Sequence, residues 1–96
     1  GVQPQAINND GTIVGAAVRS TFERALIWPP GATEPIDFNT LVNLPGETLV
    51  EAMDINNAGQ ILARGHNGYY IFTPIPEPAA GACAGMAALF RRRRRV

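Results

Sequence analysis

The sequence predicts a mostly β protein, with short antiparallel strands in propeller-like repeat units of about 48 residues and an apolar helix at the C-terminal end. Three observations lead to this fold class. One sequence pattern occurs twice, short β-branched and aromatic runs follow each copy, and an uncharged segment precedes five arginines at the end of the chain. We divide the chain into a β-repeat region of about one and a half units (1–74), a Pro-Glu-Pro linker (75–78) and an apolar helix with a terminal Arg cluster (79–96).

The repeat rests on residues 6–15 and 54–63, which align at an offset of 48 residues. Both copies contain Ile-Asn-Asn-x-Gly-x-Ile, and each is followed by an aromatic-aliphatic run, at 25–28 and at 69–72. Self-similarity at a fixed period of this length is typical of repeat architectures. Two such copies in one short chain are unlikely to arise by chance.

The strands are expected in the order in which the apolar runs occur. Residues 13–18, 25–28 and 69–73 are short apolar runs bounded by Gly or Pro, which is typical of strands. Asn-Asp-Gly at 9–11 and Asn-Ala-Gly at 57–59 predict tight turns, because Gly takes positive φ without steric cost and Asn caps its own turn. Residues 36–42 predict either another strand or a short turn.

Four short strands in 48 residues is the size of one propeller blade, and one blade cannot close a ring. The chain begins without Met, a basic segment or an apolar leader. We therefore expect it to be the C-terminal part of a longer repeat array.

The pattern I-N-x-x-G-x-I-V-G, followed by an A-F-L-W-like run and a D-L-N-x-L segment, resembles the HAF-type repeats of bacterial extracellular proteins. These elements stand at 7–15, 25–28 and 37–41, and 55–63 opens the next copy. Leu26 replaces the usual Phe, and Ala63 stands where the first copy has Gly15. The resemblance implies a β-repeat fold and says little about a ligand.

The repeat region offers three kinds of candidate site. The Asn- and Asp-rich turns resemble calcium loops, but both lack the bidentate Glu, so a hairpin turn is favoured over a metal site. A single Ser, His and Cys give no catalytic motif, and we expect no enzyme activity, cofactor or metal. Trp28, Tyr69 and Tyr70 are candidates for a carbohydrate-stacking face, with a role in the core favoured instead.

The tail carries the strongest signal. Residues 79–90 are uncharged and, as a helix, would be about 18 Å long, shorter than the roughly 30 Å hydrocarbon core. A cluster of cations follows: Arg91, Arg92, Arg93, Arg94 and Arg95. Cations directly after an apolar segment stay on the cytoplasmic side of a membrane. We favour a membrane over nucleic acid as the partner of this tail, because an uncharged apolar segment has no use in a nucleic-acid-binding tail.

Charge is divided in the same way. Residues 1–74 carry seven acidic residues against three arginines, a net charge of −4, whereas residues 75–96 carry one Glu against five arginines, a net charge of +4. Such an asymmetry indicates a basic tail with its own role.

Pro76, Glu77 and Pro78, the apolar segment and the terminal arginines together resemble the PEP-CTERM sorting signal of bacteria. The resemblance implies processing near Pro-Glu-Pro by an exosortase, a membrane protease-transpeptidase. Two prolines keep such a site extended and accessible. The apolar segment is short and rich in Ala, which favours a transient stop in the inner membrane over a permanent anchor.

We therefore expect an exported, non-enzymatic protein of the bacterial cell envelope or extracellular matrix. Its partners would be an exosortase-type enzyme, transiently the membrane through 79–95, and an extracellular polysaccharide. The alternatives are a carbohydrate- or polymer-binding propeller module, and an enzyme whose active site lies in a preceding part of the chain.

Overall fold

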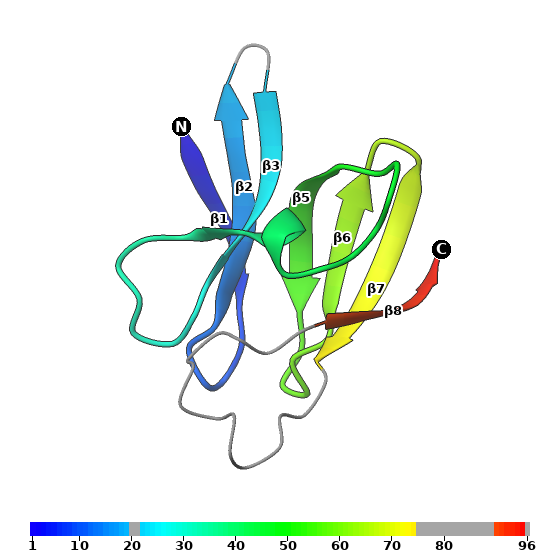
Figure 1. Cartoon of the computed structure of the whole chain (residues 1–96). Helices are drawn as coiled ribbons and strands as arrows, with labels where there is room; N and C mark the ends of the chain where they lie inside the picture. The colour runs from blue at the N-terminus through cyan, green and yellow to red at the C-terminus, as the bar shows by residue number, and fades with distance from the viewer. Residues whose placement is uncertain (20–21, 75–89, 96) are drawn as a thin grey trace.

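The computed structural model of the chain describes residues 1–19, 22–74 and 90–95. These residues form two four-stranded antiparallel sheets, so the predicted mostly β class is confirmed (Figure 1). Each sheet is a meander in which every strand pairs with the next one along the chain. The described residues form no α-helix and close neither a barrel nor a propeller ring.

The first sheet contains β1 (Val2–Ile7), β2 (Ile13–Arg19), β3 (Phe22–Trp28) and β4 (Ile36–Asp37). A short 3-10 helix, η1 (Phe38–Thr40), follows β4 and leads to the second sheet. The second sheet contains β5 (Leu49–Ile55), β6 (Ile61–Gly65), β7 (Gly68–Pro74) and β8 (Phe90–Arg95).

The strand register carries the same repeat as the sequence. Ile7 pairs with Ile13 in the first sheet, and Ile55 pairs with Ile61 in the second. The register also shifts at equivalent places, between Pro4 and Ala6 in β1 and between Ala52 and Asp54 in β5. A bulge in both copies at the same offset indicates that the whole unit is repeated, since bulges are specific features of a strand pair.

The offset between equivalent residues of the two sheets changes from 48 residues in the first two strands to 44 residues in the third. Trp28 pairs with Ile13, and Phe72 pairs with Ile61, so these two aromatic residues are equivalent. The β2–β3 pairing runs on to Arg19 and Phe22, whereas the β6–β7 pairing ends at Gly65 and Gly68. A shorter hairpin in the second copy accounts for the difference.

Both repeat turns lie at the same end of the molecule (Figure 1), and their geometry explains the shared motif. The Asn8 Oδ1 accepts the Thr12 N–H at 3.0 Å, and the Asn56 Oδ1 accepts the Gln60 N–H at 2.9 Å. A glycine three residues after each Asn has φ of +91° in the first turn and +81° in the second, which only glycine adopts readily. The predicted tight turns are thus confirmed.

The two sheets stack through unlike faces. Cross-strand partners share a face, and successive residues alternate between faces. We call the face with Ile7, Ile13 and Trp28, or with Ile55, Ile61 and Phe72 in the second sheet, the front face. We call the opposite face the back face.

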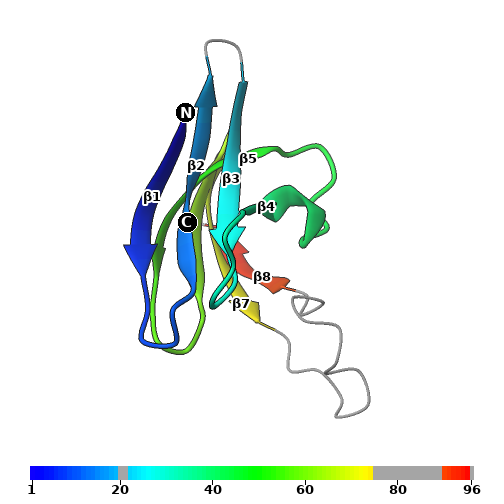
Figure 2. The same cartoon turned by 90° about the vertical axis from the view of Figure 1, so that its left-hand side faces the viewer.

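The back face of the first sheet packs on the front face of the second, and β5 contacts β1, β2 and β3 (Figure 2). The buried cluster at this contact joins both sheets, η1 and β5: Val14, Ala25, Ile27, Phe38, Leu49, Ala52, Ile55, Ile61, Ala63, Tyr70 and Phe72. The rings of Phe38 and Phe72 meet edge to face at 5.3 Å. Full burial of such a side chain contributes about 1.5–3 kcal/mol, so this contact holds the two copies together.

The segment 36–42 combines both alternatives predicted for it, a two-residue strand followed by one helical turn. The Asp37 Oδ1 caps η1 by accepting the Asn39 N–H at 2.9 Å. The Asn39 amide then bonds the N–H and the C=O of Leu49, at 2.8 and 2.9 Å. This segment therefore ties the end of the first unit to the start of the second.

β1 and β5 were not predicted as strands from the sequence. The predicted helix over 79–90 lies outside the described residues except for Phe90, where β8 begins. Residues 91–95, expected as charges flanking that helix, run as strand beside β7. Among the described ranges, no helix has the length and apolar character needed to cross a membrane.

Candidate functional site

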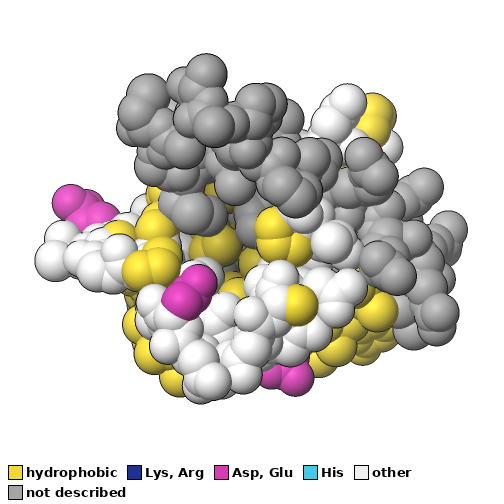
Figure 3. Space-filling model, turned by 90° about the horizontal axis from the view of Figure 1, so that it is seen from below, with side chains coloured by type: hydrophobic (Ala, Val, Ile, Leu, Met, Phe, Trp, Pro, Cys, Tyr) yellow, Lys and Arg dark blue, Asp and Glu magenta, His cyan; other side chains and the backbone are white. Residues whose placement is uncertain are grey.

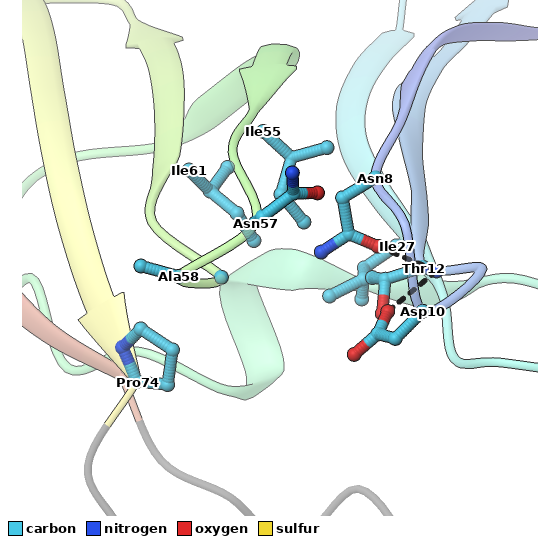
Figure 4. A pocket seen from close by; sticks show the side chains of 10 residues that line it. Asn8, Asp10, Thr12, Ile27, Ile55, Asn57, Ala58, Ile61 and Pro74 are labelled. Atoms are coloured by element: carbon cyan, nitrogen blue, oxygen red, sulfur yellow. Dashed lines mark hydrogen bonds between the residues drawn. The ribbon is translucent and has the colours of Figure 1, made fainter.

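The two repeat turns enclose a groove at the lower end of the molecule (Figure 4). Its volume is about 210 Å³. The lining comes from both sheets and both turns: Asn8, Asp10, Thr12, Ile27, Ile55, Asn57, Ala58, Gly59, Ile61 and Pro74. Seen from below, hydrophobic and acidic side chains reach the surface here, and no Lys, Arg or His of the described residues is in view (Figure 3).

The polar groups of the groove are already hydrogen-bonded within the first turn. The Asp10 Oδ1 accepts the Thr12 N–H at 3.0 Å and the Thr12 Oγ1–H at 2.7 Å. The groove is smaller than the 300–1,000 Å³ that is common for small-molecule sites. Its arrangement suits a seam between two packed units better than a site that binds and orients a substrate.

The turns are also joined to each other across the groove. The Asn8 Nδ2 donates to the Asn56 C=O at 3.1 Å, and the Asn9 N–H donates to the Asn57 Oδ1 at 2.8 Å. All four residues belong to the two copies of Ile-Asn-Asn. The second Asn of the motif therefore serves contact between units, whereas the first Asn shapes its own turn as well.

A calcium site at these turns is the alternative to the favoured hairpin turn. In the part of the chain that the structure describes, no group of three or more His, Cys, Asp or Glu side chains could hold a metal ion. The Asn8 and Asp10 oxygens instead accept hydrogen bonds from Thr12. The geometry is that of a capped turn.

A second polar cluster surrounds the Glu47 carboxylate, just before β5. Its Oε1 accepts the N–H groups of Thr48 and His66, at 2.9 and 2.8 Å. Its Oε2 accepts the Asn67 N–H at 2.9 Å and the Tyr70 hydroxyl at 2.7 Å. The carboxylate thus links the segment before β5 to the turn of the β6–β7 hairpin.

Two opposing effects set the pKa of Glu47. Burial raises the pKa, whereas the hydrogen bonds from the Tyr70 hydroxyl and from the three backbone N–H groups lower it. The hydrogen bonds prevail, and the pKa lies below the ordinary value of 4.5. A carboxylate held ionised and saturated with donors is not a general acid or base near neutral pH, and we assign Glu47 a structural role.

Sequence reasoning missed this cluster because its members are far apart in the chain. A Cβ on Gly65 would lie 2.6 Å from the Glu47 Cδ, so only glycine leaves room for the carboxylate. The short Gly-His-Asn-Gly stretch at 65–68 was the one available signal, and it indicates a turn without naming its partner.

The three candidate aromatic residues lie on different surfaces. Trp28 is buried on the front face of the first sheet, and Tyr70 is buried on the front face of the second, in the contact between the sheets. Tyr69 points to the back face of the second sheet and is 42% exposed. The structure therefore does not bring them together as one ligand face.

The candidate nucleophiles are no better placed. Ser20 and Cys83 lie outside the described residues, and His66 is exposed in the β6–β7 turn. The hydrogen bond from His66 to Glu47 comes from the His66 backbone N–H, and the imidazole takes no part in it.

The sorting residues Pro76, Glu77 and Pro78 lie outside the described residues. Pro74, the last residue of β7, lines the groove, so the motif begins two residues after the end of β7. The backbone of residues 91–95 is described as β8, which pairs with β7.

Comparison of the chain with models of protein families, with curated proteins and with solved structures finds no match.

Proposed function

We propose that the chain is an exported bacterial protein of the cell envelope or extracellular matrix, sorted by its C-terminal tail and processed by an exosortase. The observation that carries the proposal is the order of three parts at the end of the chain. Pro-Glu-Pro, an uncharged segment and five arginines follow one another after the last residue of β7. Two prolines so close together favour an extended backbone, which suits recognition by a protease.

The tail residues have separate roles in this proposal. Pro76, Glu77 and Pro78 are recognised by the processing enzyme. Residues 79–90 enter the inner membrane, and Arg91, Arg92, Arg93, Arg94 and Arg95 stay on its cytoplasmic side. The body takes no part in catalysis in this proposal, which agrees with a Glu47 carboxylate and an Asp10 Oδ1 that accept hydrogen bonds within the fold.

The test is to follow processing and location in the bacterium that makes the protein. A variant with Pro76→Ala, Glu77→Ala and Pro78→Ala is expected to keep its tail, as seen by intact mass. A variant with glutamine at 91–95 is expected to leave the membrane fraction. The control replaces Pro30 and Glu34, in the loop between β3 and β4, by Ala. Normal processing of the first variant, together with normal fractionation of the second, would refute the proposal.

A second candidate is a polymer-binding module, favoured by one observation, the exposed Tyr69 beside Arg64 on the back face of the second sheet. Aromatic rings at a surface stack on sugar rings. Tyr69→Ala is expected to reduce retention on polysaccharide at least several-fold if this reading holds, and Trp28→Phe, at a buried ring, serves as the control. Unchanged retention of Tyr69→Ala rejects it.

We further infer that each four-stranded meander is one unit of a larger propeller-like array. The support is the unlike-face contact between the two copies, since such a contact can be repeated in one direction.

A further inference from the structure

We propose that the β1 side of the first sheet's front face is a docking surface for a preceding repeat unit, and that the back face of the second sheet ends the stack. The occupant is a sheet whose back face carries small apolar residues, as the first sheet's own back face does. This inference rests on the array inferred above and is independent of the sorting tail.

The first step compares equivalent positions on the two front faces. Ile55 is 9% exposed because the first sheet covers it, whereas its counterpart Ile7 is 63% exposed. Val2 is 52% exposed at the start of β1, and Leu49, its counterpart by strand register, is 0% exposed. The β1 side of the first sheet's front face thus presents in the open apolar positions that the second sheet buries. Leu26 and Trp28, which lie on β3 of the same face, are buried within the chain itself.

The second step concerns the back faces. In the first sheet Ala6, Ala16 and Ala25 lie on this face, and small side chains there let the second sheet approach. The strand register places Asp54, Arg64 and Tyr69 at the equivalent positions of the second sheet. This sheet therefore has charged or bulky groups wherever the first has alanine.

Two charged groups of that face are paired with each other. The Arg64 Nε lies 3.3 Å from the Glu51 Oε1, across the β5–β6 pair. A polar outer face is the feature that terminal repeats of stacked arrays require for solubility. The second sheet has the character of such a terminal unit.

The third step comes from the turns and does not depend on apolar surface. Between the copies, the Asn8 Nδ2 donates to the Asn56 C=O, and the Asn9 N–H donates to the Asn57 Oδ1. In the second copy the Asn56 Nδ2 donates instead to the Gln60 Oε1 of its own turn, at 3.0 Å. Gln60 stands where the first copy has Thr12. The second turn therefore bonds the Asn56 amide within itself, whereas the equivalent Asn8 amide bonds the next unit.

All three observations give the stack the same direction. The exposed isoleucine, the alanine positions and the side chain at Thr12 or Gln60 each distinguish an inner unit from a last one. The contact is heterologous, because one unit offers its back face to the front face of the next.

The first experiment adds a unit. A chain with residues 1–48 duplicated before Gly1 is compared with the original chain by urea unfolding, each with and without Ile7→Arg, where Ile7 is the residue of the original unit. In the original chain the substitution is expected to shift the midpoint by less than about 0.3 M, because Ile7 is exposed. In the longer chain Ile7 is buried, and the expected shift is about 1 M or more. Equal shifts in both chains would overturn the proposal.

The second experiment removes the terminal character of the second sheet. Asp54→Ala, Arg64→Ala and Tyr69→Ala together are expected to convert the chain into a head-to-tail oligomer, whose mass by light scattering rises with concentration. Adding Ile7→Arg is expected to restore the monomer, whereas Glu34→Arg, in the exposed β3–β4 loop, serves as the control and leaves the oligomer in place.

If the triple variant stays monomeric while folded, the terminal role of the second sheet is wrong. If it does not fold, the first experiment decides the proposal alone. Neither result depends on processing of the tail, so failure here is distinct from failure of the sorting proposal.

Discussion

Glu47 shows how one charged side chain organises a hairpin that is almost twenty residues away in the chain. Its four hydrogen bonds come from three N–H groups and one hydroxyl. Hydrogen bonds to a charged group are stronger than those between neutral groups, so the carboxylate stabilises the turn more than an amide would.

Replacing Glu47 by Gln is expected to lower the free energy of unfolding by about 1–2 kcal/mol, because an amide has one acceptor oxygen in place of two. Chemical unfolding at pH 7 measures this. Glu34→Gln, at an exposed loop position, is the control and is expected to change little.

The same residue predicts a pH dependence. The folded-state pKa of Glu47 lies below the unfolded value of about 4.5, so its contribution is fully present above pH 4.5. That contribution is lost as the pH falls through the folded-state pKa. The difference in stability between the native chain and Glu47→Gln is therefore expected to shrink below pH 4.5, and a constant difference would show that ionisation of Glu47 is not involved.

At the scale of elements, the two repeat turns are alike in sequence and unlike in what they join. Both first asparagines accept backbone N–H groups of their own turn, but only Asn8 also donates across the groove to the other copy. The Asn56 amide donates to Gln60 within its turn. The same motif therefore acts once as a contact between units and once as a closed turn.

Asn8→Ala is expected to lower the free energy of unfolding by about 1–2 kcal/mol more than Thr12→Ala does. The reason is that Asn8→Ala removes one hydrogen bond within the turn and one between the sheets. Asn56→Ala is expected to weaken only the second turn. Hydrogen exchange separates the two: protection of the Asn9 N–H falls in Asn8→Ala and is retained in Asn56→Ala. Identical exchange patterns would show that the turns are not coupled.

The sequence predicted these elements to different degrees, for physical reasons. The β2, β3 and β7 strands carry β-branched or aromatic runs between turn residues, so local pattern locates them. β1 begins with Val-Gln-Pro-Gln, and β5 contains Glu51 and Asp54, so neither has a clear alternation. They form strands because they pair with β2 and β6, and the local sequence pattern does not show these pairings.

The candidate site was predictable to a lesser extent. The Ile-Asn-Asn motif located both turns, but the contact between them depends on how the sheets stack, which no local pattern specifies. Likewise, the adjacent residues Tyr69 and Tyr70 point to opposite faces of a strand, yet which of them faces the core depends on which face of the second sheet meets the first. Packing between units settled both questions.

At the scale of the whole molecule, the connection between the sheets is part of the core. Phe38 is fully buried in η1, between the two sheets, and its ring meets Phe72 of the second sheet. Asn39 bonds both backbone groups of Leu49 from the same turn. The two units are therefore expected to unfold as one.

Phe38→Ala is expected to cost about 3–5 kcal/mol, a large part of the 5–15 kcal/mol that is typical of small domains. Ile7→Ala, at an exposed position of the first sheet, is the control and is expected to cost well under 1 kcal/mol. Urea unfolding followed both by tryptophan fluorescence, which reports on Trp28, and by circular dichroism should give a single transition. Two separate transitions would show that the sheets unfold independently.

The pairing of β8 with β7 has a consequence for the proposed processing. Pro74 pairs with Phe90, so the strand that covers the outer edge of β7 comes from beyond the Pro-Glu-Pro motif. Pairing of β8 with β7 and insertion of the tail in the membrane exclude each other. Cutting the chain at that motif would end both and leave the backbone N–H and C=O groups of the edge unpaired. A bare strand edge readily takes up a strand from another chain. Processing would then also expose a strand edge, through which the protein could associate laterally with other chains at the place where it is delivered.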